Sequence, residues 1–399
     1  MSQATLASTP PQFSAARTIR LVGLTLALGY LVLLGGAYLQ GNFLTDAQRA
    51  PIANDFVNVW AAGQLARDGQ AAAAYDWPTH KAAEIRAVGH DFPAYYGWHY
   101  PPFFLFVAAA LATLPFLTAA LISLVASFVA YVAAMAAILG RTGIFLAIGF
   151  PAAIWNVTAG QNGFLTAALI GGTLTLLERR PALAGLCLGL LTYKPQFGLL
   201  FPLVLIADRR WHTIAVAALV ALALSASAWL AFGAASFEAF VHWMPITSRT
   251  VLGDGAADFA RLQSLFGLVR ASGGGEALAW SVQATASFAL AAAVTVLWRS
   301  AAPYELKAAA LAAGVVLVTP YVYMYDLVVL AVAVAFLLRI ALRSALTATE
   351  IVGLGAAGAL VLSFPYVKTQ VGLAAALIVF ALVVLRTLGE HRAPTADRA

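Results

Sequence analysis

The chain has 399 residues, of which 62% are hydrophobic and only 10% are charged. A water-soluble domain carries about 25% charged residues, so the composition predicts a polytopic membrane protein. The formal net charge of +6 comes from Lys and Arg residues spaced between apolar runs. That spacing is typical of the loop ends of membrane proteins and not of a nucleic-acid surface. We therefore expect no nucleic-acid partner.

The cysteine content and the N-terminal residues exclude further classes of protein. Cys187 is the single cysteine, which excludes an internal disulfide and a thiol-rich metal site. Residues 1–16 are polar and are predicted to form a disordered cytoplasmic terminus. The apolar run 19–39 is too long for a signal-peptide core, so we predict a retained first helix. Arg17 and Arg20 precede it, and positive residues tend to stay in the cytoplasm. Leu39 should therefore emerge outside.

The next segment, residues 40–100, forms a predicted first extracytoplasmic loop. It holds six of the seventeen acidic residues, namely Asp46, Asp55, Asp68, Asp76, Glu84 and Asp91. Its apolar residues recur with helical spacing from Phe56 to Leu65, and Gly69 interrupts the pattern. The loop is expected to fold into short helices at the membrane interface, with Trp and Tyr at headgroup depth.

Further apolar runs fill the remainder of the chain, apart from a second polar outer loop at 233–277. They cover 103–114, 117–139, 144–158, 164–177, 183–193, 197–206, 213–232, 278–298, 306–318, 327–338, 346–364 and 371–388. Several are shorter than the ~20 residues that a straight span needs. Lipid cannot satisfy free backbone amides, so such breaks should line a cavity within the protein.

The predicted fold class is an all-α polytopic membrane protein with about 11 to 13 transmembrane or re-entrant helices. One membrane domain covers 17–388, and a disordered cytoplasmic tail covers 389–399. Only the run 103–114 does not fit a regular alternation. At about twelve residues it either turns back as a re-entrant or tilted segment, or it crosses with one basic cluster outside.

Basic residues orient the remaining runs. An alternation that is consistent from Leu117 onward puts all of these on the inner side: Arg141, Arg179, Arg180, Arg209, Arg210, Arg299, Arg339, Arg343 and Arg386. The same topology brings four polar motifs to the outer side, together with Asp55. They are 160–162, 193–196, 233–277 and 321–326. Their convergence predicts a site at the outer boundary of the membrane.

Asp55 is the candidate for chemistry in the first loop. It lies beside Phe56, Val59 and Trp60, so its carboxylate is expected to be partly desolvated. Such a group suits a general base that takes a proton from a hydroxyl. The alternative is that Asp55 caps an interfacial helix, because Asn54 and Asp55 are both good N-cap residues. The residue alone leaves both interpretations open.

A resemblance favours the catalytic interpretation. The stretch that runs from Asp55-Phe56 through Trp60-Ala61-Ala62-Gly63, Asp68-Gly69 and Tyr75-Asp76 to Tyr100-Pro101-Pro102-Phe103 resembles the first-loop signature of family 87 glycosyltransferases. These belong to the GT-C superfamily of polyprenyl-phosphate-sugar-dependent enzymes. Gly160-Gln161-Asn162, the run from Ala184-Gly185 to Lys194-Pro195, and Arg209-Arg210-Trp211 are also similar to that family. The resemblance extends from about residue 20 to residue 340 and depends on the order and spacing of these motifs together.

The resemblance implies a GT-C-like bundle and an inverting, metal-independent transfer without a cofactor, in which Asp55 activates the acceptor hydroxyl. It implies a polyprenyl-phosphate donor, commonly of mannose or a pentose, and a lipid or glycan acceptor of the cell envelope, in contact with membrane lipids. The implied location is the bacterial cytoplasmic membrane, with both termini cytoplasmic and the site facing outward. Some family members carry a histidine near 321–326. This chain has none there, so that role is not carried over.

The leaving lipid phosphate requires a cation. Lys194 lies between Tyr193 and Pro195 in an apolar run, where a lysine is costly unless it has an anionic partner. The alternative is a lysine that snorkels from a helix end. Arg249 and Arg261 in the second outer loop are further candidates, and Gln263 in the same loop is included as a polar substrate-binding candidate.

The other candidates for substrate binding are polar or aromatic residues at the breaks. Asp326 can accept hydrogen bonds from sugar hydroxyls. Gln161 and Asn162 either bind the donor or cap a helix. His99 and Tyr100 either wall the site or anchor the chain at the interface. No His/Cys/Asp/Glu cluster with metal-ligand spacing occurs, so no metal is expected.

A transporter or lipid flippase without covalent chemistry is the alternative function, since broken helices and buried charges also suit transport. The halves of the chain show no convincing similarity to each other, whereas internal repeats are common in transporters. A long acidic outer loop also has less use in a transporter. Both observations favour the enzyme.

Overall fold

The computed structural model describes residues 15–256 and 258–392. Within them the chain forms 18 α-helices joined by loops and short 3₁₀ turns, and its only β pairing is two isolated bridges near residues 43–51. The predicted all-α fold class is confirmed. The short N-terminal stretch 1–14, residue 257 and the end of the predicted tail, 393–399, lie outside the described residues.

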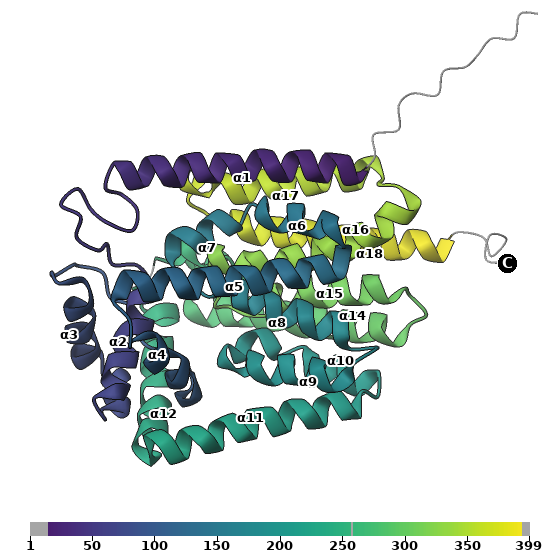
Figure 1. Ribbon diagram of the computed structural model, residues 1–399. Coiled ribbons are helices and arrows are strands. Elements are labelled where there is room, and N and C mark those ends of the chain that lie inside the picture. The colour runs from purple at the N-terminus through teal and green to yellow at the C-terminus, as the bar shows by residue number, and fades with distance from the viewer. Residues whose placement is uncertain (1–14, 257, 393–399) are drawn as a thin grey trace, which may run out of the picture.

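Seven helices are long and apolar enough to cross a membrane, or eight if one bent pair is a single span. The bent pair is α6 (Arg141–Ile148) with α7 (Ala153–Ala159), which meet at 54°. The long helices are α1 (Ala15–Leu39), α5 (Phe116–Leu139), α11 (Trp211–Phe232), α14 (Glu276–Arg299), α17 (Ala348–Val367), α18 (Val371–Arg392) and the segment Met324–Ser344, which joins a 3₁₀ turn to α16 (Leu330–Ser344). Figure 1 shows them side by side in one elongated bundle.

The core of the bundle is built from helices that other helices surround. α16 and α15 (Tyr304–Leu317) are buried along almost their whole length. α15 is rich in alanine and contains Gly314, and such small residues let neighbouring helices approach closely where there is no water to drive packing. α8 (Gly163–Leu176), α9 (Pro181–Leu190) and α10 (Phe201–Ala207) are likewise shorter than a full span. The short predicted runs therefore correspond to short helices, of which α8 is largely buried whereas α9 and α10 are partly exposed.

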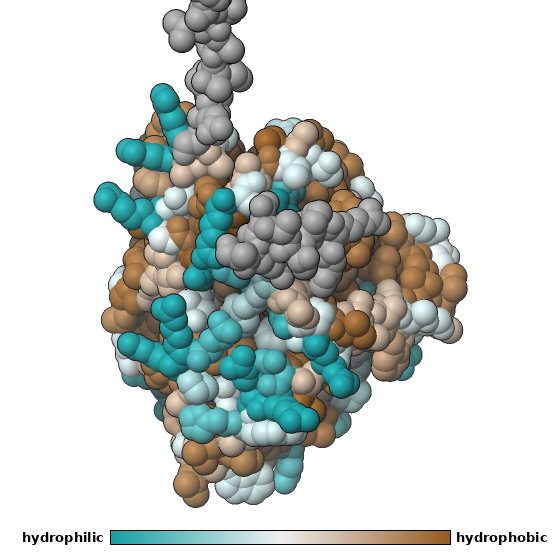
Figure 2. Space-filling model, turned by 90° about the vertical axis from the view of Figure 1, so that its right-hand side faces the viewer, coloured by the Kyte–Doolittle hydropathy of each residue, from teal (hydrophilic) through white to brown (hydrophobic). Residues whose placement is uncertain are grey.

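The two ends of the bundle differ in composition. At one end lie the first described residue of α1 and the last of α18, and Figure 2 shows hydrophilic side chains gathered there. The predicted inner arginines follow or precede helices at this end, such as Arg141 at the start of α6 and Arg299 at the end of α14. The opposite end carries α2 (Phe56–Arg67), α3 (Trp77–Val88) and α12 (Ala234–Ser248), which lie across the bundle axis. The polar motifs and the basic clusters thus occupy opposite ends.

The run 103–114 turns back without crossing. α1 ends and α5 begins at the same end of the bundle, and the run between them forms only a 3₁₀ turn and α4 (Leu105–Leu111). α4 packs against α2 through Gly63, where a Cβ would come within 2.1 Å of the Ala108 carbonyl oxygen. A glycine is needed for this close approach. The run therefore does not cross the bundle, which is what the first of the two alternatives requires.

Two segments are more regular than their composition predicts. The second outer loop contains α12, a π-helical turn at Arg249–Gly253 and α13 (Leu265–Ala271). The predicted disordered tail 389–399 begins inside α18, which continues to Arg392. Arg386 explains that continuation, because it pairs with Glu390 at 3.5 Å one turn along the helix and with Glu350 of α17 at 3.0 Å.

Candidate active site

Three interruptions of the helical backbone meet at the end of the bundle that carries α2 and α3. They lie between α7 and α8 at 160–162, between α9 and α10 around Lys194, and between α15 and α16 at 318–326. Each needs partners for the backbone groups that a continuous helix would satisfy. The Gly163 amide donates to Asn156 Oδ1 at 2.8 Å, and the Tyr323 amide donates to Asp326 Oδ2 at 3.1 Å. Side chains thus replace helical hydrogen bonds at these breaks.

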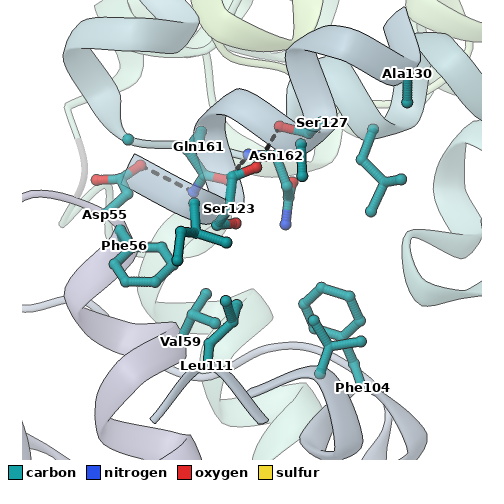
Figure 3. A pocket seen from close by; sticks show the side chains of 15 residues that line it. Asp55, Phe56, Val59, Phe104, Leu111, Ser123, Ser127, Ala130, Gln161 and Asn162 are labelled. Carbon is teal, nitrogen blue, oxygen red and sulfur yellow. Dashed lines mark hydrogen bonds between the residues drawn. The ribbon is translucent and has the colours of Figure 1, made fainter. Parts of the chain in front are cut away.

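Asp55 occupies the N-cap position of α2 but does not cap the helix. Its side chain makes no capping hydrogen bond, and the Phe56 amide donates instead to Asn54 Oδ1 at 3.1 Å. Asp55 Oδ2 accepts a hydrogen bond of 2.9 Å from Gln161 Nε2, as Figure 3 shows. The carboxylate is therefore directed at the α7–α8 break and not at its own helix. The capping interpretation describes Asn54 and does not describe Asp55.

Gln161, Asn162 and Tyr100 form one hydrogen-bonded group behind Asp55. Asn162 Nδ2 donates to the Tyr100 hydroxyl at 2.8 Å, and that hydroxyl donates to Gln161 Oε1 at 3.4 Å. The Tyr193 hydroxyl donates to the Asn162 carbonyl at 3.1 Å. The Gln161 Oε1 atom accepts from the Tyr100 hydroxyl, so the side-chain nitrogen of Gln161 is the atom left to face Asp55. The network thereby fixes the orientation of the carboxylate.

A cavity of about 280 Å³ opens in front of Asp55. Its lining is mostly apolar, and its polar groups are Asp55, Gln161 and Asn162 at one end and two serines on the wall formed by α5. One wall is α5, from Ile122 through Ser123, Ala126 and Ser127 to Ala130. Eight residues of helix extend roughly 12 Å, so the cavity runs from the carboxylate along the spanning helix toward the middle of the bundle. Ile122 is 47% exposed, so the cavity is open beside the lipid-facing surface of α5.

The surroundings of Asp55 favour a proton acceptor. Burial raises the pKa of the Asp55 carboxyl to about 6, against the lowering effects of the hydrogen bond from Gln161 and of the positive charges on Lys194 and Arg261. A carboxyl group with this pKa is ionised at neutral pH and is a stronger base than an ordinary aspartate. The geometry and the pKa together suit the abstraction of a proton from a hydroxyl group.

Lys194 and Asp326 form a buried ion pair. Lys194 Nζ lies 2.9 Å from Asp326 Oδ1, and the two residues are only 7% and 2% exposed. Both side chains are enclosed by protein, so a lysine that snorkels from a helix end does not describe Lys194. The anionic partner that such a lysine requires is Asp326. Asp326 also accepts from the Tyr323 amide, so both of its oxygens are engaged.

The remaining predicted residues are divided between surface and scaffold. Arg249 is exposed in the π-helical turn after α12. Gln263 is buried, and its side chain bonds only backbone groups: it donates to the carbonyls of Ala260 and Arg261 and accepts from the Gly372 amide at 2.8 Å. That pattern describes a residue that ties the second outer loop to α18. His99 is exposed and lines a smaller cavity beside α12.

The α5 wall of the cavity was not predicted from the sequence. Ser123 and Ser127 lie one turn apart on α5, and Ala126 and Ala130 occupy neighbouring positions of the cavity wall. A stripe of small and hydroxylated residues at i and i+4 is the signal that could have revealed it. Arg261, an alternative cation in the sequence, lies close enough to affect the pKa of Asp55.

Comparison with known proteins gives one match. The model of glycosyltransferase family 87 matches residues 98–320. This range includes Tyr100, Gln161, Asn162 and Lys194 but begins after Asp55 and ends before Asp326. No curated protein and no solved structure matches the chain. Within the part of the chain that the structure describes, no three His, Cys, Asp or Glu side chains come together as metal ligands would.

The buried ion pair generates a prediction about stability. Lys194→Met leaves Asp326 as an uncompensated buried charge, so it should lower the free energy of unfolding by about 3–5 kcal/mol. Lys194→Met combined with Asp326→Leu should recover most of that loss, because no charge then remains buried. Thermal unfolding of the purified single and double variants in one detergent measures the coupling. Additive losses in the double variant would contradict the pairing.

Proposed function

Because the chain belongs to glycosyltransferase family 87, we propose that it moves a sugar from a polyprenyl-phosphate donor to a hydroxyl of a lipid or glycan acceptor, with inversion at the anomeric carbon. The chain is thus an integral-membrane glycosyltransferase, and the family favours this function over the transporter. Mannose or a pentose is the proposed sugar. The observation that supports the proposal most directly is the position of Asp55 at the polar end of an apolar cavity.

The shape of that cavity suits a substrate with a lipid tail and a polar head. An isoprenoid chain is apolar and would lie along α5, beside Ala126 and Ala130. The chain would exchange its contacts with lipid for contacts with these apolar side chains, so little free energy would be lost on entry. The phosphate and the sugar would then reach Asp55, Gln161 and Asn162. The opening beside the lipid-facing surface of α5 would let the chain enter sideways from the bilayer without passing through water.

The proposed step needs one base. The Asp55 carboxylate takes the proton of the acceptor hydroxyl as its oxygen forms a bond to the anomeric carbon. The bond between that carbon and the phosphate oxygen breaks, its electron pair leaves with the polyprenyl phosphate, and inversion follows from attack opposite the leaving group. A phosphate is already a stable anion, so it needs positive charge more than a proton from an acid.

Two cations are proposed to contact the donor, one at its phosphate and one at its sugar. The charge of Lys194 is matched by Asp326, whereas Arg261 is exposed in the turn at Phe259–Arg261. Arg261 is therefore the proposed primary contact, and a guanidinium can hold two phosphate oxygens at once. The Lys194–Asp326 pair would orient the sugar beside it.

The proposed setting follows from the two ends of the bundle. Basic residues gather at the end that carries the described ends of α1 and α18, and positive residues favour the cytoplasm. Asp55 would then face the extracytoplasmic side of a bacterial cytoplasmic membrane, with both termini inside. Envelope lipids and glycans are the acceptors available there. No cofactor and no nucleic-acid partner are part of the proposal.

The first test removes the base without changing its size. Asp55→Asn should lower turnover about 10²–10⁴-fold, because the amide cannot accept the proton. Release of polyprenyl phosphate from polyprenyl-phosphate mannose or pentose, with host membrane extract as the acceptor source, measures it in proteoliposomes. Asp68→Asn is the matched control, since Asp68 is exposed in the same loop. Near-wild-type turnover by Asp55→Asn would remove Asp55 from the role of base.

The pH dependence tests the environment of Asp55. The base acts when ionised, so activity should fall as the pH is lowered through about 6. Gln161→Leu removes the hydrogen bond that favours the ionised form, so the pKa of Asp55 rises and the acid limb of the kcat/KM profile moves to higher pH. The full profiles of both proteins are compared. A shift to lower pH, or no shift, would contradict the assignment of the limb to Asp55.

The cavity itself is tested by filling it. Ala126→Trp places a large ring in the proposed path of the isoprenoid chain and should raise the KM for the donor about tenfold or more, because the tail loses its contacts. Val129→Trp is the control, since Val129 lies on the same helix, is 61% exposed and does not line the cavity. Equal donor KM values for the two variants would exclude this cavity as the tail site.

A further inference from the structure

A second, smaller cavity lies between the first outer loop and α12. Its volume is about 50 Å³, and aromatic rings make up most of its wall: Tyr75, Trp98, His99, Phe240 and Trp243, with Thr247 beside them. It lies at the same end of the bundle as Asp55, since α12 and the residues before α4 lie there. Unlike the larger cavity, it has no wall from a membrane-spanning helix. A ligand would therefore reach it from the outer surface.

The rings around this cavity are held in place by one another. Trp243 stacks on Trp77 with ring centres 5.8 Å apart and an interplanar angle of 20°, and Trp77 also contacts Tyr95 at 4.8 Å. Tyr75 meets Phe240 edge to face at 5.7 Å. These contacts restrict the rotamers of the rings, so their faces are presented without further ordering cost. Tyr95 is nonetheless 38% exposed.

Polar groups on the wall of the cavity can bond a hydroxyl group. The Thr247 hydroxyl can donate or accept a hydrogen bond, and one ring nitrogen of a neutral His99 donates while the other accepts. A ligand hydroxyl can therefore be met in either role.

The charge of the wall narrows the ligand class. None of the described residues that line the cavity is Asp, Glu, Lys or Arg. A phosphate or a carboxylate would find no cation there, and an amine would find no anion. Sugar rings combine a face of C–H groups, which packs on aromatic faces, with neutral hydroxyls that bond N–H and O–H groups. A neutral sugar therefore suits the aromatic rings and the Thr247 hydroxyl of this wall.

The ring of Tyr100 connects the wall of this cavity to the group around Asp55. Trp98 contacts Tyr100 at 4.9 Å, and Tyr100 belongs to the hydrogen-bonded group that holds Asp55 through Gln161. We propose that this aromatic cavity binds a neutral sugar ring of the acceptor, so that an adjoining hydroxyl is held toward Asp55. The inference rests on the proposed transferase function and adds to it the acceptor class, a neutral glycan, either free or as the headgroup of a glycolipid.

Binding can be tested without catalysis. Saturation-transfer NMR on the whole protein in nanodiscs would use neutral oligosaccharides of mannose, glucose, galactose and arabinose, each free and linked to a short alkyl chain. At least one should bind, and Trp243→Ala should weaken it about tenfold through the loss of the ring face. His99→Ala removes another wall residue and should weaken it severalfold. Trp243→Phe should retain part of the affinity, and Trp211→Ala, exposed at the far end of α11, should retain all of it.

The outcomes separate this inference from the proposed function. No binding by the native protein to any member of the set, or equal affinity in Trp243→Ala and His99→Ala, would overturn the aromatic site even if sugar transfer occurs. Binding that depends on Trp243 and His99, in a protein that transfers no sugar from either donor, would leave the site in place and overturn the transferase proposal. Stronger binding of the alkyl-linked forms alone would identify a glycolipid headgroup as the source of the sugar.

Discussion

The structure depends on one constraint, the need to satisfy the backbone groups of three interrupted helices away from water. The interruption between α15 and α16 is closed in part by polar side chains from distant parts of the chain. Ser264 Oγ donates to the Pro320 carbonyl at 2.7 Å, and Gln283 Nε2 donates to the Leu317 carbonyl at 3.1 Å. Neither lipid nor an apolar core could supply these bonds. The polar residues of the second outer loop and of α14 are thus required by the fold before any question of function arises.

The same constraint accounts for the position of the candidate site. Broken helices must end where other protein groups can meet their free amides and carbonyls, so the breaks gather at one end of the bundle. Asn162 serves both the fold and the candidate site. Its carbonyl accepts a hydrogen bond from Tyr193, and its side chain donates to Tyr100, which also bonds Gln161. Gln161 in turn holds Asp55. The first outer loop is therefore positioned by the same side chains that supply hydrogen bonds at the α7–α8 break.

Local patterns predicted the elements, and long-range contacts decided their roles. Apolar period and length identified the helices and their breaks, because both depend on neighbouring residues. Whether Asp55 caps α2 was open in the sequence, since the residue that turns it away, Gln161, lies 106 positions along the chain. The partner of Lys194 is 132 positions away and was assigned to sugar binding instead. The helices of the second outer loop were missed because Pro245 and Arg249 interrupt their apolar pattern.

Tyr100 contacts one residue of each of two cavities, Trp98 of the smaller and Gln161 of the larger, and the separation of the two cavities bears on the mechanism. The larger one is apolar, borders a spanning helix and ends at Asp55, whereas the smaller one is aromatic, borders only the outer loops and lacks charge. A lipid-linked donor and a glycan acceptor enter from different solvents, so a transferase that serves both needs two approaches to one base. Tyr100 contacts Trp98 on one side and Gln161 on the other. Under the proposed function, the ring that divides the two substrates also holds the network that orients the base between them.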